Sequence, residues 1–272
     1  VTGYLHIEEA LTGFDLETAQ AAADRYIYSD PAQYPPGFRT RPRDLTAEQA
    51  GNLPLIRYEN GFAYDRSLEA MTMSPATWPI IKELTDNKPR LVSGTLSYQS
   101  YWEDQPPNFT SAGGLHGGPL PLLYRYQVKD ERIFCNNFVC FFYLTDVESG
   151  DGGLIVIPGS HKGELARPDD LLSPDEEGLD AIEDPVFTNL TPKAGDFVII
   201  SELLTHGVLR WRRKDTDRRF LILRYVPQYE GKMSLPEEIL ERLAPETQEL
   251  VSSAGYGHQK EITHQEVVTL SA

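Results

Sequence analysis

A mainly β fold with flanking helices, built as a jelly-roll barrel, is the fold class that this sequence predicts. Between residues 90 and 226, short apolar segments follow one another at regular spacing. Turn residues such as Gly, Pro, Asp and Asn separate them, which is typical of strands in sandwiches and barrels. Two segments of helical periodicity precede these strands and a third follows them, so we expect helices packed outside the barrel.

The length of the chain, 272 residues, suits one large domain or a domain with an appended arm. We expect residues 1–230 to form the barrel domain with its N-terminal helices, and residues 231–272 to form a C-terminal helical arm and tail. The two cysteines, Cys135 and Cys140, are five residues apart in a strand-like run. Their side chains would point to opposite faces and could not pair. Two buried thiols predict a reducing compartment, and therefore a cytoplasmic protein.

The composition limits the classes of partner. Hydrophobic residues make up 40% of the chain, which is typical of a globular protein. The formal net charge is -16, and so acidic a surface disfavours nonspecific contact with nucleic acid or anionic lipid. No apolar run approaches the roughly 20 residues that cross a membrane. The composition therefore predicts a soluble protein that works apart from nucleic acid and membranes.

The N-terminal part of the chain contains two predicted helices. A short strand at residues 4–7 comes first, and residues 15–27 then repeat apolar side chains at the spacing of an amphipathic helix. Residues 30–60 are rich in Pro, Arg, Asp and Tyr, which predicts a surface loop. Ser74 followed by Pro75 predicts a second helix that begins there and runs to about residue 86.

The predicted strands follow in order. Apolar runs predict strands at residues 90–102, 120–128, 133–145, 154–157, 195–200, 208–211 and 218–226. An acidic insertion at residues 162–190 interrupts them; it is either a lid or a solvated loop, because long insertions beside sites often gate them. Ser234 and Glu237 have the spacing of a capping box, which predicts a C-terminal helix to about residue 243.

Two histidines beside glycines are the first candidates for chemistry. His116 lies in Gly-Gly-Leu-His-Gly-Gly-Pro, and His206 lies 90 residues later in Thr-His-Gly, after an apolar strand. Paired histidines from neighbouring strands, with an open coordination sphere, suit a non-haem Fe(II) centre. By spacing alone, two unrelated histidines that cap strand ends are the simpler interpretation.

Four segments resemble motifs of the phytanoyl-CoA dioxygenase family. Residues 152–162, Gly-Gly-Leu-Ile-Val-Ile-Pro-Gly-Ser-His-Lys, resemble the signature that follows the family's metal strand. Residues 192–196 resemble the turn before the distal histidine, residues 205–207 that histidine itself, and residues 218–225 the strand whose first arginine holds 2-oxoglutarate. The resemblance covers roughly residues 1–230. It implies a double-stranded β-helix (jelly roll, cupin-like), Fe(II), 2-oxoglutarate, O₂ and a small-molecule substrate whose unactivated C–H bond is oxidised.

The resemblance assigns individual residues. His116 and His206 match the family's two histidine ligands, and Arg218 matches the arginine that anchors 2-oxoglutarate. A guanidinium fork suits the distal carboxylate of that co-substrate, whereas the neighbouring Arg219 would face the other side of the strand.

Two further residues, Asn136 and Tyr124, lie on strands that we expect to line the barrel. We expect them among the residues that bind the cofactor, although a packed core would show the same pattern.

The chain departs from the family at one metal ligand. The family has His-x-Asp, in which residues two apart on a strand share a face and reach one metal, but the second position here is Gly118. In one interpretation chloride fills the vacant position, as in the related iron halogenases, which carry Gly or Ala there. In a second, water or a carboxylate from elsewhere (Glu103, Asp104, Asp130 or Glu131) fills it and the enzyme hydroxylates. In a third, the metal site is lost and the fold only binds a ligand. Glycine is also the default residue of tight turns.

Overall fold

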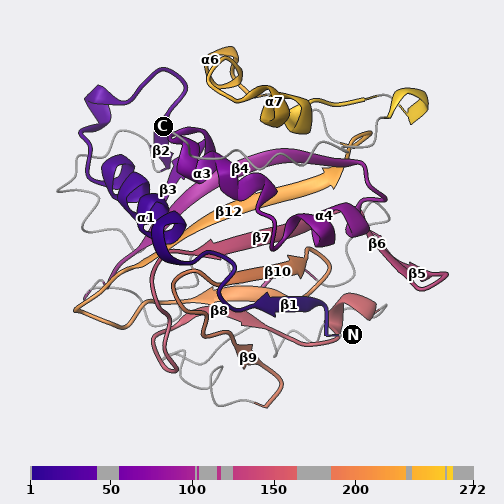
Figure 1. The fold of residues 1–272 in the computed structure, drawn as a ribbon. Helices are drawn as coiled ribbons and strands as arrows, with labels where there is room; N and C mark the ends of the chain where they lie inside the picture. The colour runs from indigo at the N-terminus through magenta and orange to yellow at the C-terminus, as the bar shows by residue number, and fades with distance from the viewer. Residues whose placement is uncertain are drawn as a thin grey trace.

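The computed structural model describes residues 2–41, 55–101, 103, 115–117, 125–163, 185–230, 235–254 and 256–259. Within these ranges the chain forms two β-sheets that pack face to face, with helices against the outer face of the larger sheet (Figure 1). This arrangement confirms the predicted mainly β, jelly-roll fold with flanking helices. None of the helices in these ranges is long and apolar enough to cross a membrane.

The larger sheet has seven strands in the order β1-β10-β7-β12-β4-β3-β2, and each is antiparallel to its neighbours. Its strands are β1 Tyr4–Ile7, β2 Arg39–Arg41, β3 Ile56–Glu59, β4 Pro89–Gln99, β7 Phe138–Tyr143, β10 Phe197–Ser201 and β12 Arg218–Pro227. The smaller sheet, in the order β11-β8-β9, consists of β8 Gly153–Val156, β9 Thr188–Asn189 and β11 His206–Leu209. A separate hairpin of β5 Tyr126–Lys129 and β6 Arg132–Cys135 projects from the body of the molecule (Figure 1).

Alternation along β7 and β12 divides the hydrophobic core into two layers. Every second residue packs towards the helices: Cys140, Phe142, Leu221, Leu223 and Tyr225. The residues between them pack against Leu154 and Val156 of the smaller sheet: Val139, Phe141, Tyr143 and Phe220. Successive side chains of a strand point to opposite faces, so a continuous apolar run such as Phe-Val-Cys-Phe-Phe-Tyr fills both layers.

The helices cover the outer face of the larger sheet. They are α1 Gly13–Ile27, α3 Arg66–Ala70 and α4 Trp78–Leu84, followed at the C-terminus by α6 Glu237–Leu240 and α7 Pro245–Val251. Short 3₁₀ turns lie at η1 Pro31–Gln33, η2 Gly61–Ala63, η3 Met71–Met73, η4 Ser160–Lys162 and η6 Tyr256–His258. The apolar spacing predicted for α1 is confirmed, and its buried face includes Ala19, Ala22, Ala23 and Tyr26.

The prediction of one long strand over residues 133–145 is wrong. The chain breaks between β6 and β7 at Asn136, whose amide oxygen accepts the backbone N–H of Arg125 at 2.7 Å. Its amide nitrogen donates to the carboxylate of Glu230 at 2.6 Å. An asparagine side chain can take the place of a neighbouring strand as the hydrogen-bond partner of a backbone group. The strand therefore ends at Asn136 although the apolar sequence pattern continues.

The interpretation of residues 30–60 as loop is also wrong in part, because β2 and β3 form the edge of the larger sheet. Strands this short carry too little alternation to be found by periodicity. The helix predicted from Ser74 begins only at Trp78, after a turn in which the carbonyl of Ser74 accepts from Thr77 and Trp78. The C-terminal helix predicted to run from Ser234 to about residue 243 is present as the shorter α6, and a second helix, α7, begins at Pro245.

Two further predictions concern segments at the edge of the described ranges. Most of the insertion at 162–190 lies outside them; β9 is its described strand. In the C-terminal arm, Ile239, Leu243, Leu250 and Val251 belong to the same core as the outer layer of the larger sheet. The described part of the arm is thus packed against the barrel domain.

Candidate metal centre

His116 and His206 meet although 90 residues separate them. The backbone N–H of each donates to the carbonyl of the other at 2.9 Å, which makes an antiparallel bridge. Their ring centroids are 4.0 Å apart. Residues that exchange both hydrogen bonds across an antiparallel pair point to the same face, so the two imidazoles are presented together. His206 is the first residue of β11, not the end of a strand as its position after an apolar run indicated.

The tautomer of His206 is determined by its surroundings. Its Nδ1 lies 2.7 Å from the carbonyl oxygen of Leu204 and donates to it, which leaves the lone pair on Nε2. The side chain is buried. Burial first, and then the positive charge that His116 would carry, lower the pKa of His206 to about 4. A neutral imidazole oriented by a carbonyl is the form that binds a metal ion.

Gly117 explains how the chain brings His116 to this position. Its φ of +87° lies in the left-handed region, and a Cβ there would collide with the carbonyl of Leu204. The same carbonyl orients His206. Glycine is therefore required for the close approach. Gly118, the expected carboxylate position, and Tyr124, the predicted cofactor contact, lie outside the described residues.

No third metal ligand completes the pair within the described ranges, because no group of three His, Cys, Asp or Glu there could hold a metal ion. Of the carboxylates considered above, Asp130 and Glu131 form the tip of the β5–β6 hairpin. Glu103 approaches Lys214 at 3.8 Å, and Asp104 lies outside the described residues. None of the described carboxylates therefore serves as a third metal ligand beside the two histidines.

Glu202 and Arg224 provide the charges that act on His206 besides His116. The two form an ion pair. The carboxylate raises the pKa of His206 and the guanidinium lowers it, both less than burial does. The two effects oppose each other, and that of Glu202 is the larger.

Arg218 is a buried cation without a counter-ion among the described residues. It is fully buried, with 0% of its surface exposed. Its guanidinium donates to the amide oxygen of Gln99 at 3.0 Å and to the hydroxyl of Tyr143 at 3.1 Å. It makes no ion pair with any described carboxylate, and its Nε has no partner. A buried unpaired charge is costly, and a bound carboxylate would satisfy it.

The neighbouring arginines differ from Arg218. Arg219 points to the other side of β12 and forms ion pairs with Asp217 at 2.6 Å and with Asp24. Arg224 is paired with Glu202. This geometry favours Arg218 as the anchor for 2-oxoglutarate, and that role stays a prediction. Sequence reasoning missed its partners Gln99 and Tyr143; their inward alternation on β4 and β7 is the signal that could have found them.

Asn136 has contacts that belong to the fold. Its amide joins the β6–β7 turn to Arg125 and Glu230, and the side chain is buried. The structure thus places it in a structural hydrogen-bond network, while its expected part in cofactor binding stays untested.

The sheets and the histidine pair define a double-stranded β-helix of the cupin type with a candidate metal centre. The family model of phytanoyl-CoA dioxygenase (PhyH) matches residues 107–219, a range that contains both histidines and Arg218, and it confirms the resemblance to this family. Among curated proteins, the dioxygenase cdmD of Talaromyces verruculosus is 28% identical over 142 residues, which are 51% of this chain and 42% of that protein. The match thus spans about two fifths of the relative's length.

Solved structures support the same fold. HygX from Streptomyces hygroscopicus, with nickel and 2-oxoglutarate bound, superposes with a TM-score of 0.64 at 19% identity, over 95% of this chain and 93% of that one. SnoK, a non-heme alpha ketoglutarate dependent carbocyclase from nogalamycin biosynthesis, superposes with a TM-score of 0.57 at 16% identity, over 90% and 87%. At sequence identities this low, the structural similarity shows a shared fold alone.

Proposed function

We propose that this protein is an Fe(II)- and 2-oxoglutarate-dependent oxygenase that oxidises a C–H bond of a small molecule with O₂. The observation that carries the proposal is the combination, in one barrel, of a bridged histidine pair with a buried Arg218 that makes no ion pair with a described carboxylate. The family match at residues 107–219 and the nickel and 2-oxoglutarate bound by HygX support it.

The residues present fit this cofactor set. The Nε2 of His206 and the imidazole of His116 would hold the iron, and Arg218 would hold the distal carboxylate of 2-oxoglutarate. When bound, the iron and 2-oxoglutarate supply O₂ activation coupled to decarboxylation of the co-substrate. The protein orients the imidazole through the carbonyl of Leu204 and excludes water from the guanidinium with the ring of Phe220, 4.2 Å from the Arg218 Cζ.

The position of Gly118 leaves two outcomes for this oxygenase. The described carboxylates do not complete the histidine pair, so we propose that an exogenous ligand, chloride or water, occupies the place of the family's aspartate. Chloride would direct the reaction to halogenation and water to hydroxylation. The buried free thiols Cys135 and Cys140 support a reducing, cytoplasmic setting for either reaction.

Anaerobic absorption spectroscopy tests the proposal. Addition of Fe(II) and 2-oxoglutarate to the folded protein is expected to produce a metal-to-ligand charge-transfer band. A folded protein without this band would be a jelly-roll ligand-binding protein instead, and the proposal would be wrong. If NaCl shifts the band and sodium gluconate does not, the protein is a halogenase. If chloride leaves the band unchanged, it is a hydroxylase.

A further inference from the structure

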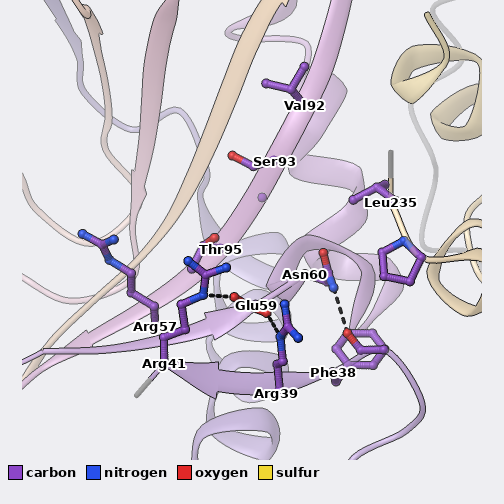
Figure 2. A pocket seen from close by; sticks show the side chains of 13 residues that line it. Phe38, Arg39, Arg41, Arg57, Glu59, Asn60, Val92, Ser93, Thr95 and Leu235 are labelled. Atoms are coloured by element: carbon purple, nitrogen blue, oxygen red, sulfur yellow. Dashed lines mark hydrogen bonds and ion pairs between the residues drawn. The ribbon is translucent and has the colours of Figure 1, made fainter. Parts of the chain in front are cut away.

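A cavity of about 670 Å³ lies on the strands at the far edge of the larger sheet (Figure 2). Three arginines line it: Arg39 and Arg41 of β2 and Arg57 of β3. Glu59 of β3 and the polar side chains Ser93 and Thr95 of β4 lie beside them. The family match, which begins at residue 107, does not include any of these strands.

The lining carries an excess of positive charge. Glu59 is the one carboxylate among the described lining residues, and it forms ion pairs with both Arg39 and Arg41. Figure 2 shows Glu59 between these two, with Arg57 pointing away from them. Arg57 makes no ion pair with a described residue. Three arginines and one glutamate leave a net charge of +2 (3 − 1) in a protein of formal net charge -16.

The strand register places these charged side chains on one face of the sheet and sets two arginines directly opposite each other, which is an unfavourable pairing. Arg41 is directly opposite Arg57, while Thr40 and Tyr58 point into the other face and are buried. Like charges directly opposite each other destabilise a sheet. Partial burial, and to a smaller degree the charges of Arg41 and Arg224, lower the pKa of Arg57. The arrangement is therefore built to receive negative charge.

The cavity lies on the same face of the larger sheet as Arg218, the face that packs against the smaller sheet with its histidine pair. On β4, Gln99 contacts Arg218 and Thr95 lines the cavity, four residues apart and so roughly 13 Å along a strand. Arg224 lies opposite Ser93 in the register. Its charge acts both on Arg57 and on His206, so Arg224 lies near both groups.

We propose that this cavity binds the anionic group, a carboxylate or a phosphate, of the compound that is oxidised at the histidine pair, with Arg57 as the principal contact. The inference rests on the proposed function, since it places the substrate along β4 between the arginines and the iron. Guanidinium forks favour both anions through charge-assisted hydrogen bonds. The oxidised carbon would then lie several bonds from the anion.

Ligand-observed NMR titration with four probes of equal chain length tests this inference. Hexanoate, hexyl phosphate, hexanol and hexylamine are compared with 2-oxoglutarate in excess, so that binding at Arg218 alone is suppressed. One or both anions are expected to bind at least about tenfold more tightly than hexanol and hexylamine. The better of the two identifies the anionic group. Equal binding of all four probes overturns the inference.

Matched variants locate the binding. Arg57→Gln is expected to weaken binding of the preferred anion about tenfold or more, and Arg57→Lys to restore part of it. Arg132 of β6, which forms an exposed ion pair with Asp86, provides the control. Arg132→Gln removes the same charge and is expected to leave the affinity for the preferred anion unchanged. An equal loss in both glutamine variants, or in neither, overturns the inference.

The Fe(II)–2-oxoglutarate absorption band separates the two proposals. It is expected to persist in Arg57→Gln, because that side chain is not in the metal centre. Anion binding through Arg57 without any band in the parent protein overturns the proposed function and leaves the anion site standing. A normal band without anion selectivity overturns the anion site alone.

Discussion

At the scale of single residues, His206 concentrates the features of a metal ligand. It is buried, its Nδ1 is held by the carbonyl of Leu204, and its pKa is lowered to about 4. His206→Ala is therefore expected to abolish the Fe(II)–2-oxoglutarate band and to lower iron affinity at least about tenfold. His258→Ala, at an exposed histidine of η6, is the control. A band that survives in His206→Ala excludes this residue as a ligand.

Arg218 can be tested against its neighbour on the same strand. Arg218→Met is expected to raise the Kd of 2-oxoglutarate roughly thirtyfold or more, which is about 2 kcal/mol. The stability is expected to be unchanged or higher, because the buried guanidinium has no described counter-ion. Arg219→Met, which removes ion pairs with Asp217 and Asp24, should leave the Kd unchanged. Isothermal titration calorimetry measures the Kd of 2-oxoglutarate for both variants. A raised Kd in Arg219→Met with an unchanged Kd in Arg218→Met would reassign the anchor to Arg219.

Gly117 and Gly150 make a matched pair of glycines. Both have positive φ, +87° and +90°. A Cβ on Gly117 would collide with Leu204, whereas one on Gly150 would meet nothing within 4 Å. We expect Gly150→Ala to cost about 1 kcal/mol of unfolding free energy from backbone strain. Gly117→Ala should cost clearly more and also weaken the charge-transfer band. Urea denaturation checks the difference; equal costs would mean that the loop relaxes away from Leu204.

At the scale of elements, the β6–β7 turn is held by Asn136. Its contacts with Arg125 and Glu230 join this turn to the end of β12. Burial raises the pKa of Glu230, and the hydrogen bond from Asn136 opposes that rise. Asn136→Ala is expected to lower the unfolding free energy by about 1–2 kcal/mol and to leave the Kd of 2-oxoglutarate unchanged. A weaker Kd at unchanged stability would instead make Asn136 a cofactor contact, as its position on a predicted barrel strand first indicated.

Strand alternation and register place Arg218 and the lining of the arginine-lined cavity on one face of the larger sheet. Alternation along β12 directs Arg218, Phe220 and Arg224 towards the smaller sheet, while Leu221 and Leu223 pack under the helices. The antiparallel register then sets Gln99 opposite Arg218 and Ser93 opposite Arg224. Arg218 and the arginine-lined cavity therefore lie on one face of the larger sheet, which continues across β12, β4, β3 and β2.

At the scale of the whole molecule, the net charge of -16 makes self-repulsion a destabilising term. We expect the melting temperature of the metal-free protein to rise by a few degrees between about 0.02 M and about 0.2 M NaCl, because the Debye length falls to roughly 7 Å. Differential scanning fluorimetry measures this, with sodium gluconate as the comparison. A rise in chloride alone would reveal specific halide binding instead of screening.

Much of the fold and of the candidate site could be predicted from local patterns. The segments before His206 and after Arg218 are apolar or alternate over several residues, and both histidines lie beside glycine. Such signals are local, so they survive without knowledge of the partner strand. They were sufficient for the barrel, and they misplaced the strand break at Asn136, where one hydrogen-bonding side chain outweighs an apolar run. The roles of the two histidines and of the arginine came from the family resemblance and stay predictions.

The sequence by itself determined the residue types that suit iron and 2-oxoglutarate chemistry, and the gap at Gly118. Only the tertiary structure decided that His116 bridges His206, that Arg218 is buried with no described carboxylate as counter-ion, and that Arg41 lies opposite Arg57. Strand pairing joins residues far apart in the chain, and its register is set by the packing of both faces at once. Burial and the pairing of charges follow from that register, so neither can be deduced from the order of residues along one strand.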